Sequence, residues 1–188
     1  MRSGVGHAAA VLALAGLLTA TPSQTAVAGD PVVAARRASM KEMAAAAKAI
    51  AEMFDGKRAY DPAAFKAAAN ALSARTGPAL IAEFPVGTLG APSGAKPEID
   101  QARPEFEALA SHIGRLAEAL AAKAEEAPAA IGDDMRMGTG LPMDGGSLLG
   151  KRPNAAAADP ARMPAEHLLH LILQDCASCH SKFRQRQQ

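Results

Sequence analysis

The residues best suited to chemistry in this sequence lie near its C-terminal end, in the stretch Cys176-Ala177-Ser178-Cys179-His180. A C-x-x-C-H pattern is the signature of haem c attachment, in which two thiols add to the porphyrin and the histidine binds the iron. The stretch falls in a run with helical character that extends from Ala165 to Arg184. On a helix the two cysteines and the histidine are spaced i, i+3 and i+4, so they project from one face. We therefore predict one haem c, bonded covalently to Cys176 and Cys179, with His180 as axial iron ligand.

Two other chemistries use the same residue types. A Cys176–Cys179 disulfide of the thioredoxin kind belongs at a strand-to-helix junction, and the sequence shows no strand alternation. Zinc would also need His167 and His170, but one straight helix separates His167 from Cys176 by about 13 Å. Zinc ligands lie about 2.0–2.3 Å from one ion, so geometry excludes this site. We interpret His167, His170 and His112 as solvated or flanking residues, and the haem-free redox disulfide remains an alternative.

A predicted helix over residues 32–54 supplies two further candidates, Arg36 and Met40. Every member of its predicted core seam except Arg36 is apolar, and a buried guanidinium is costly unless it is paired. A haem propionate would supply the missing anion, which arginine binds bidentately. Met40 lies one turn further on, so its thioether is a candidate sixth iron ligand, on the side opposite His180. The seam alternates steps of three and four residues: Val33, Arg36, Met40, Met43, Ala47, Ile50 and Phe54.

Arg184 is a third candidate, because it follows His180 by four residues and lies on the same side of the last helix. The helix dipole alone favours a cation at a helix C-terminus. We also predict that the charge of Arg184 tunes His180 or the haem edge. The sequence places no distal His/Arg acid–base pair, so we do not expect an enzyme.

The whole pattern predicts an all-α protein, an up-down-up-down four-helix bundle. Aromatic residues make up only 3% of the chain, and alanine, the best helix former, is abundant. After the first helix, we expect a second from Asp61-Pro62 with a break at Gly77-Pro78, a third capped by Asp100, and a fourth from about Pro164. The residues expected on their buried sides are Phe65, Ala69, Leu72, Leu80 and Phe84, then Phe106, Leu109, Ile113, Leu116 and Leu120, then Leu169, Ile172, Leu173, Cys176, His180 and Phe183.

Residues 127–163 interrupt the helical periodicity with repeated glycine and proline. A connection of this length without helical or strand pattern is unusual within a compact domain. We interpret it as an insertion before the last helix. Its four methionines, Met135, Met137, Met143 and Met163, have no neighbouring histidine or cysteine, which disfavours a copper site.

The first 28 residues predict a secretory signal peptide. Arg2 precedes an apolar run from Ala8 to Ala20, which is too short to span a bilayer, and Ala26-Val27-Ala28 offers a cleavage site. Cleavage removes one of the 20 Lys and Arg and none of the 19 acidic residues, so the mature chain, residues 29–188, is electrically balanced. We expect a single exported, periplasmic domain without a membrane span, and a balanced charge argues against binding to nucleic acid.

The chain resembles the cytochrome c′ family, whose bundles have this up-down-up-down topology. The resemblance is carried by Arg36-x-x-x-Met40, by Cys176-x-x-Cys179-His180 followed by Arg184, and by two stretches nearby, Phe84-Pro85-x-Gly87-Thr88 and Pro97-Glu98-Ile99. It implies a periplasmic haem protein, often a homodimer, with Arg36 near a propionate and Met40 at the distal position. Two features depart from the family pattern. Asp100 stands where a tryptophan is common, and residues 127–163 replace a short connection.

Two functions follow from the resemblance, because the family contains two kinds of member. If Met40 binds the iron, the protein is a six-coordinate carrier that passes single electrons to periplasmic redox partner proteins. If Met40 only packs over the iron, the haem is five-coordinate and binds small gases such as NO or CO. We expect the electron carrier.

Overall fold

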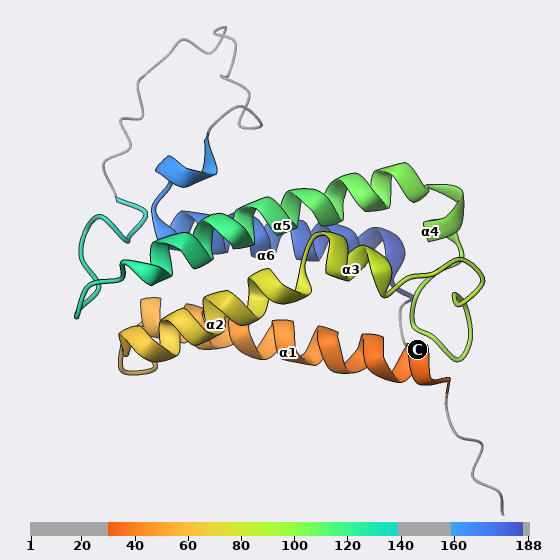
Figure 1. Cartoon of the computed structure of the whole chain (residues 1–188), viewed down its shortest axis with the longest axis horizontal. Helices are drawn as coiled ribbons and strands as arrows, with labels where there is room; N and C mark the ends of the chain where they lie inside the picture. The colour runs from red at the N-terminus through yellow and green to blue at the C-terminus, as the bar shows by residue number, and fades with distance from the viewer. Residues whose placement is uncertain (1–29, 139–158, 186–188) are drawn as a thin grey trace, which may run out of the picture.

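The computed structural model describes residues 30–138 and 159–185. Its long helices, α1 (Pro31–Phe54), α2 (Pro62–Arg75), α5 (Arg103–Glu125) and α6 (Ala165–Phe183), lie side by side and alternate in direction (Figure 1). Shorter helical segments connect them: α3 (Pro78–Ala82), α4 (Glu98–Gln101) and the 3-10 helix η2 (Pro160–Arg162). The predicted four-helix bundle is confirmed. The expected signal peptide, residues 1–28, and residues 139–158 of the insertion lie outside the described residues.

The first two helices begin at an Asp-Pro pair, as the sequence predicts for the second. Oδ1 of Asp30 accepts a hydrogen bond from the N–H of Val32 at 2.9 Å, and Oδ1 of Asp61 accepts one from Ala64 at 2.6 Å. The following prolines fit the first helical turn because its N–H groups have no partner within the helix. Local chemistry therefore sets both starts.

The predicted break in the second helix is confirmed at Gly77-Pro78. α2 ends at Arg75, Gly77 has a φ of 61°, and α3 begins at Pro78. A positive φ is unfavourable for any residue with a side chain, so glycine is needed here. The break brings Gly77 against Gly114 of α5, and a Cβ on Gly114 would lie 2.7 Å from the Cα of Gly77.

The prediction that Asp100 caps the third helix is wrong. Asp100 lies inside α4, and α5 begins at Arg103 after Ala102, with no side-chain cap. Pro104 is the physical reason: it lacks an N–H and fits only in the first turn of a helix. α5 therefore starts beside Pro104, and Oδ2 of Asp100 instead accepts a hydrogen bond from the N–H of Gly87 at 3.5 Å.

The hydrophobic core of the bundle consists of two clusters of buried side chains. The larger part joins α1, α2, α5 and α6, and its large, fully buried side chains include Ile50, Phe65, Leu116, Leu120 and Leu168. The smaller part lies where α3, α4 and the ends of α5 and α6 meet, and it comprises Leu80, Phe84, Ala95, Ile99, Phe106, Ala110 and Phe183. None of the helices in residues 30–138 and 159–185 has the length and apolar character needed to cross a membrane.

The insertion is anchored to the bundle at its described ends. Met135 is 6% exposed and packs into the larger core, and its carbonyl accepts a hydrogen bond from the N–H of Glu166 at 2.9 Å. The carboxylate of Glu166 accepts one in return from the N–H of Met137 at 2.6 Å. These contacts satisfy donors at the start of α6 and fix where that helix begins.

Candidate cofactor site

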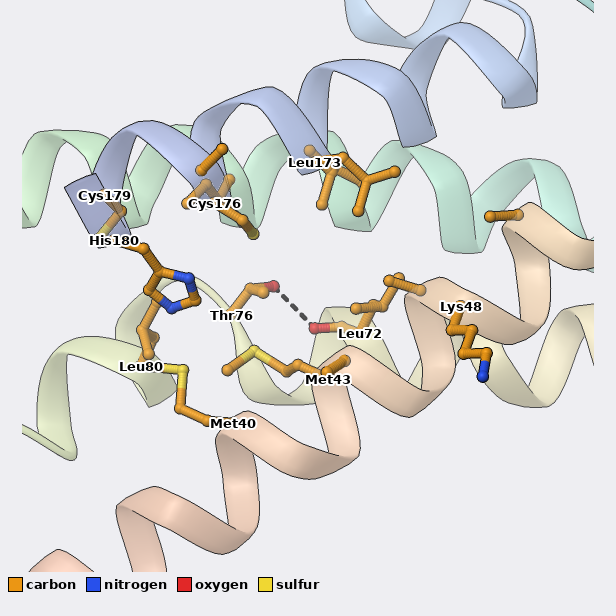
Figure 2. A pocket seen from close by; sticks show the side chains of 16 residues that line it. Met40, Met43, Lys48, Leu72, Thr76, Leu80, Leu173, Cys176, Cys179 and His180 are labelled. Carbon is orange, nitrogen blue, oxygen red and sulfur yellow. Dashed lines mark hydrogen bonds between the residues drawn. The ribbon is translucent and has the colours of Figure 1, made fainter. Parts of the chain in front are cut away.

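A cavity of about 400 Å³ opens between α1 and α6, with α2, α3 and α5 behind it (Figure 2). We call it the α1–α6 cavity. Its lining is almost entirely apolar, as is usual for a cofactor site that also carries a few polar groups. The lining residues are Met40, Met43, Ala44, Ala47, Lys48 and Ala51 of α1, Leu72, Thr76 and Leu80 around the α2–α3 break, Ile113 of α5, and Ile172, Leu173, Cys176, Ala177, Cys179 and His180 of α6.

The three residues of the C-x-x-C-H motif lie on α6 and line the cavity together. Both thiols are free and half-buried. The imidazole of His180 points from α6 into the cavity, toward the α1 side (Figure 2). The i, i+3 and i+4 spacing thus has the predicted geometrical effect, because all three side chains reach the same space.

Partial burial shifts the pKa values of these groups. It raises the pKa of both Cys176 and Cys179 to about 11, with a smaller contribution from the charge of Asp175. It lowers the pKa of His180, and the nearby charge of Arg184 lowers it further. At neutral pH the imidazole is therefore neutral, which is the form that binds a metal ion.

Met40 lines the cavity from α1, and Figure 2 shows its side chain and that of His180 directed toward one another. Two residue types that ligate haem iron therefore lie on two different helices around one space. Met43 lines the same cavity one turn away. Met43 was expected in the core of the bundle, whereas Met40 was the predicted ligand because it lies one turn beyond Arg36 on the same seam.

Arg36 is buried, with 5% of its surface exposed, but it is not among the residues that line the cavity. Its guanidinium donates to the carbonyls of Glu83 and Thr88 at 2.9 and 3.4 Å, and to the hydroxyls of Ser93 and Thr88, both at 2.9 Å. Four of its five N–H groups are therefore used by neutral acceptors. Burial lowers the pKa of Arg36, and the charges of Asp30 and Glu83 oppose that shift.

Arg184 follows the last turn of α6, and its N–H donates to the carbonyl of His180 at 3.1 Å. It is exposed and does not line the cavity. Its charge reaches the imidazole, because it contributes to the lowered pKa of His180.

Sequence reasoning missed other residues of the site. Thr76 has the one hydroxyl in the lining; it is 4% exposed and donates to the carbonyl of Leu72 at 2.9 Å. Leu173 and His180 were expected in the interior, yet both are exposed because they stand at the cavity; Leu173 is 42% exposed. His112 was interpreted as a solvated or flanking residue, yet its Nδ1 lies 2.7 Å from Oδ2 of Asp175. Only contacts between helices reveal these roles.

The cavity fits a covalently bound haem. Apolar walls suit the porphyrin, two thiols on one face suit the covalent bonds, and a neutral imidazole beside them suits the iron. An apolar body in this space would also cover Leu173, whose exposure is otherwise unfavourable. In the described part of the chain, no group of three or more His, Cys, Asp or Glu residues could hold a metal ion by itself.

A family model and several solved structures match this chain. The family model described as Cytochrome C′ matches residues 31–139, more than half of the chain; this range contains Arg36 and Met40 and ends before the cysteine motif. No curated protein sequence matches the chain. Solved structures extend the likeness beyond the matched range, because they cover 82–85% of the chain.

Three solved structures illustrate this likeness. Cytochrome c′ from Thermochromatium tepidum has 22% identity and a TM-score of 0.56, with 83% of this chain and 95% of that chain covered. Cytochrome c′ from Shewanella frigidimarina has 17% identity, a TM-score of 0.57 and the same coverage. A third cytochrome c′, described as showing an unusual ligand-controlled dimer dissociation, has 19% identity and a TM-score of 0.57, again over 83% and 95%. At these identities the likeness shows a shared fold.

Proposed function

Since this chain belongs to the cytochrome c′ family, whose members bind one c-type haem, we propose that it carries single electrons in the periplasm. When bound, haem supplies an iron centre that exchanges one electron. The observation that carries the proposal is that Met40 and His180 line one apolar cavity from two different helices. A histidine and a methionine are the axial pair of electron-carrying cytochromes c, and this pair raises the reduction potential.

Each residue of the motif has a distinct proposed role. Cys176 and Cys179 hold the haem covalently, so it stays attached in both oxidation states. His180 would supply an imidazole nitrogen to the iron, and Met40 would supply a thioether sulfur. The apolar lining excludes water, which strengthens electrostatic effects on the iron and limits competing reactions.

Two arginines are proposed to act from outside the lining. Arg36 retains one N–H group without a partner among the described residues. That group can donate one hydrogen bond to a haem propionate. Arg184 acts through its charge, because a cation close to His180 disfavours the oxidised, more positive iron.

The alternative proposal is a five-coordinate haem that binds NO or CO. The observation that favours it is the apolar lining of the cavity, in which Leu72, Leu80 and Ile113 offer a space to a small neutral gas. Thr76 does not change this, because its hydroxyl proton is already donated to the carbonyl of Leu72.

An optical spectrum of the purified protein separates the two proposals. A methionine–iron charge-transfer band in the oxidised protein, with no change on adding CO after reduction, is the expected result. A high-spin spectrum that responds to CO would establish the gas-binding protein instead. A haem stain that survives denaturing electrophoresis tests covalent attachment, and its absence would support the redox disulfide.

Two further proposals concern where the protein is located in the cell and whether it forms a dimer. We propose export to the periplasm after cleavage near Ala28, in keeping with the family, and a homodimer. The cytochrome c′ whose dimer dissociates under ligand control is similar in fold and supports the homodimer. Mass spectrometry of the mature N-terminus and light scattering of the holoprotein test these two points.

A further inference from the structure

The guanidinium of Arg36 joins α1 to a single loop, Glu83–Lys96, which we call the 83–96 loop. All four of its hydrogen bonds go to residues of this loop, at Glu83, Thr88 and Ser93. It also lies over the ring of Phe84, 4.3 Å from the centroid. A buried arginine whose four paired N–H groups all meet one loop holds that loop strongly, because leaving those donors unpaired would be costly.

The same loop is paired with the chain just after the haem motif. Ala95 and Arg184 form an antiparallel bridge. The N–H of Lys96 donates to the carbonyl of Phe183 at 2.9 Å, and the N–H of Gln185 donates to the carbonyl of Gly94 at 2.8 Å. The end of α6, which carries His180, is therefore tied to the 83–96 loop.

Ser93 joins these two sets of contacts. Its hydroxyl oxygen accepts from Nη1 of Arg36 at 2.9 Å and from the N–H of Ala95 at 3.1 Å. Ser93 is 4% exposed, so water does not readily replace either bond. A polar path thus runs from Arg36 through Ser93 and Ala95 to Arg184, whose N–H bonds the carbonyl of His180.

A chain of aromatic contacts also connects Arg36 on α1 with the end of α6. The ring of Phe84 lies under Arg36, and its centroid is 5.0 Å from that of Phe106. The centroid of Phe106 is in turn 5.6 Å from that of Phe183, in an edge-to-face arrangement. Cys179 packs against this smaller core. Two sets of contacts, both of which begin at Arg36, therefore connect the last turn of α6 with α1.

We propose that Arg36 is a positioning residue: through Ser93 and the 83–96 loop, it holds His180 in place relative to Met40 across the α1–α6 cavity. α1 and α6 pack against each other within the larger core, but the cavity lies between them at Met40 and His180. The loop spans the gap from outside. This proposal rests on the proposed axial ligation and adds a role for Arg36 that is independent of a propionate.

The test uses the holoprotein with Ser93→Ala, which breaks the polar path but keeps the charge of Arg36 and every residue of the cavity. We expect hydrogen exchange at the amides of Ala95, Lys96 and Gln185 to speed up about tenfold. We also expect the axial-ligand signature of the haem to broaden or become mixed-spin. Thr88→Ala removes a different acceptor of Arg36 and should change both readouts in the same direction. It replaces Ser93→Ala in the test if that variant folds poorly.

Ser39→Ala is the matched control. Ser39 is 1% exposed on α1, and its hydroxyl has no partner among the described residues, so its loss should leave both readouts unchanged. Identical exchange in Ser93→Ala and Ser39→Ala would overturn the proposal. An Arg36→Lys variant gives a second contradicting outcome. If its haem spectrum changes while hydrogen exchange at Ala95, Lys96 and Gln185 does not, Arg36 acts on the haem alone and the proposal fails. If Met40 does not ligate the iron at all, the wild-type spectrum lacks the methionine–iron band, which distinguishes that outcome from failure of this proposal.

Discussion

Nδ1 of His112 on α5 lies 2.7 Å from Oδ2 of Asp175 on α6, one residue before the first cysteine of the haem motif. The pair links the two helices beside the cofactor site. The side chain of Asp175 is 21% exposed and that of His112 is 41% exposed, so solvent weakens the interaction only in part. The contact helps to hold α6 against α5 at the point where the haem is attached.

Replacing His112 by alanine should lower the free energy of unfolding by about 0.5–1 kcal/mol, because one partly exposed hydrogen bond is lost. Chemical denaturation of the holoprotein measures this change. His170→Ala, on the exposed side of α6, is the control and should be close to wild type. Equal stabilities of the two variants would contradict a specific link between His112 and Asp175.

Gly114→Ala should destabilise the protein although alanine favours helices. Its Cβ would lie 2.7 Å from Cα and 2.9 Å from N of Gly77, and both are backbone atoms of the α2–α3 break. Overpacking of this kind costs about 1–3 kcal/mol, which offsets the gain of about 1 kcal/mol in helix propensity. We expect a lower midpoint of thermal unfolding and a perturbed haem spectrum, because Ile113 and Thr76 beside this contact line the cavity.

Gly94→Ala is the control for Gly114→Ala. A Cβ at Gly94 meets nothing within 4 Å, and its φ is not positive. It should leave the unfolding midpoint near the wild-type value. A Gly114→Ala protein that is as stable as the Gly94→Ala protein would show that α5 can move away without cost.

The thiols should be unreactive in the folded chain before haem attachment. Burial raises the pKa of Cys176 and Cys179 from the usual 9.0 to about 11, and only the thiolate is a good nucleophile. Alkylation by iodoacetamide at pH 8 should be much slower in folded apoprotein than in urea, and should accelerate up to about pH 11. Mass spectrometry of timed samples gives both rates, and circular dichroism verifies the fold.

The same shift predicts how the stability of the apoprotein depends on pH. Below pH 9 the thiols are protonated in both states, so they contribute no difference. Between pH 9 and about 11 the unfolded chain loses these protons first, and the free energy of unfolding should fall. Stability that rises over this interval would contradict the burial of the thiols.

Met40→Ala should leave the haem covalently attached, because both attachment residues belong to α6. It should remove the methionine–iron band and lower the reduction potential, since the sixth ligand is lost. Met43→Ala is the control: it removes a methionine from the same helix and the same cavity and should retain the band. Loss of attachment in Met40→Ala would contradict this division of roles.

Arg184→Gln should lower the reduction potential, because a positive charge near His180 disfavours the oxidised iron. The effect should shrink at high ionic strength, since Arg184 is exposed and salt screens its charge. Voltammetry at two salt concentrations measures both trends. Arg115→Gln removes an exposed charge from α5 instead, and an equal shift in that variant would show that only net charge matters.

The sequence by itself determined the helices and the cofactor motif, because both depend on local spacing. Asp-Pro pairs mark helix starts, Gly77-Pro78 marks the break, and three- and four-residue steps mark the buried faces. The cysteines and His180 share one helical face for the same reason. Pro104 moved the predicted start of α5, and Leu173 is exposed at the cavity although its spacing predicts burial.

The tertiary structure decided which distant residues meet. The partners of Arg36 lie 47–57 positions away in the sequence, and the partner of His112 lies 63 positions away. Met40 and Met43 have the same residue type on the same seam, and only the approach of α6 distinguishes the one that faces His180. Such contacts depend on the angles at which the helices pack and on which helices the loops contact. Local periodicity carries no information about either, so it predicted a buried arginine without predicting what holds it.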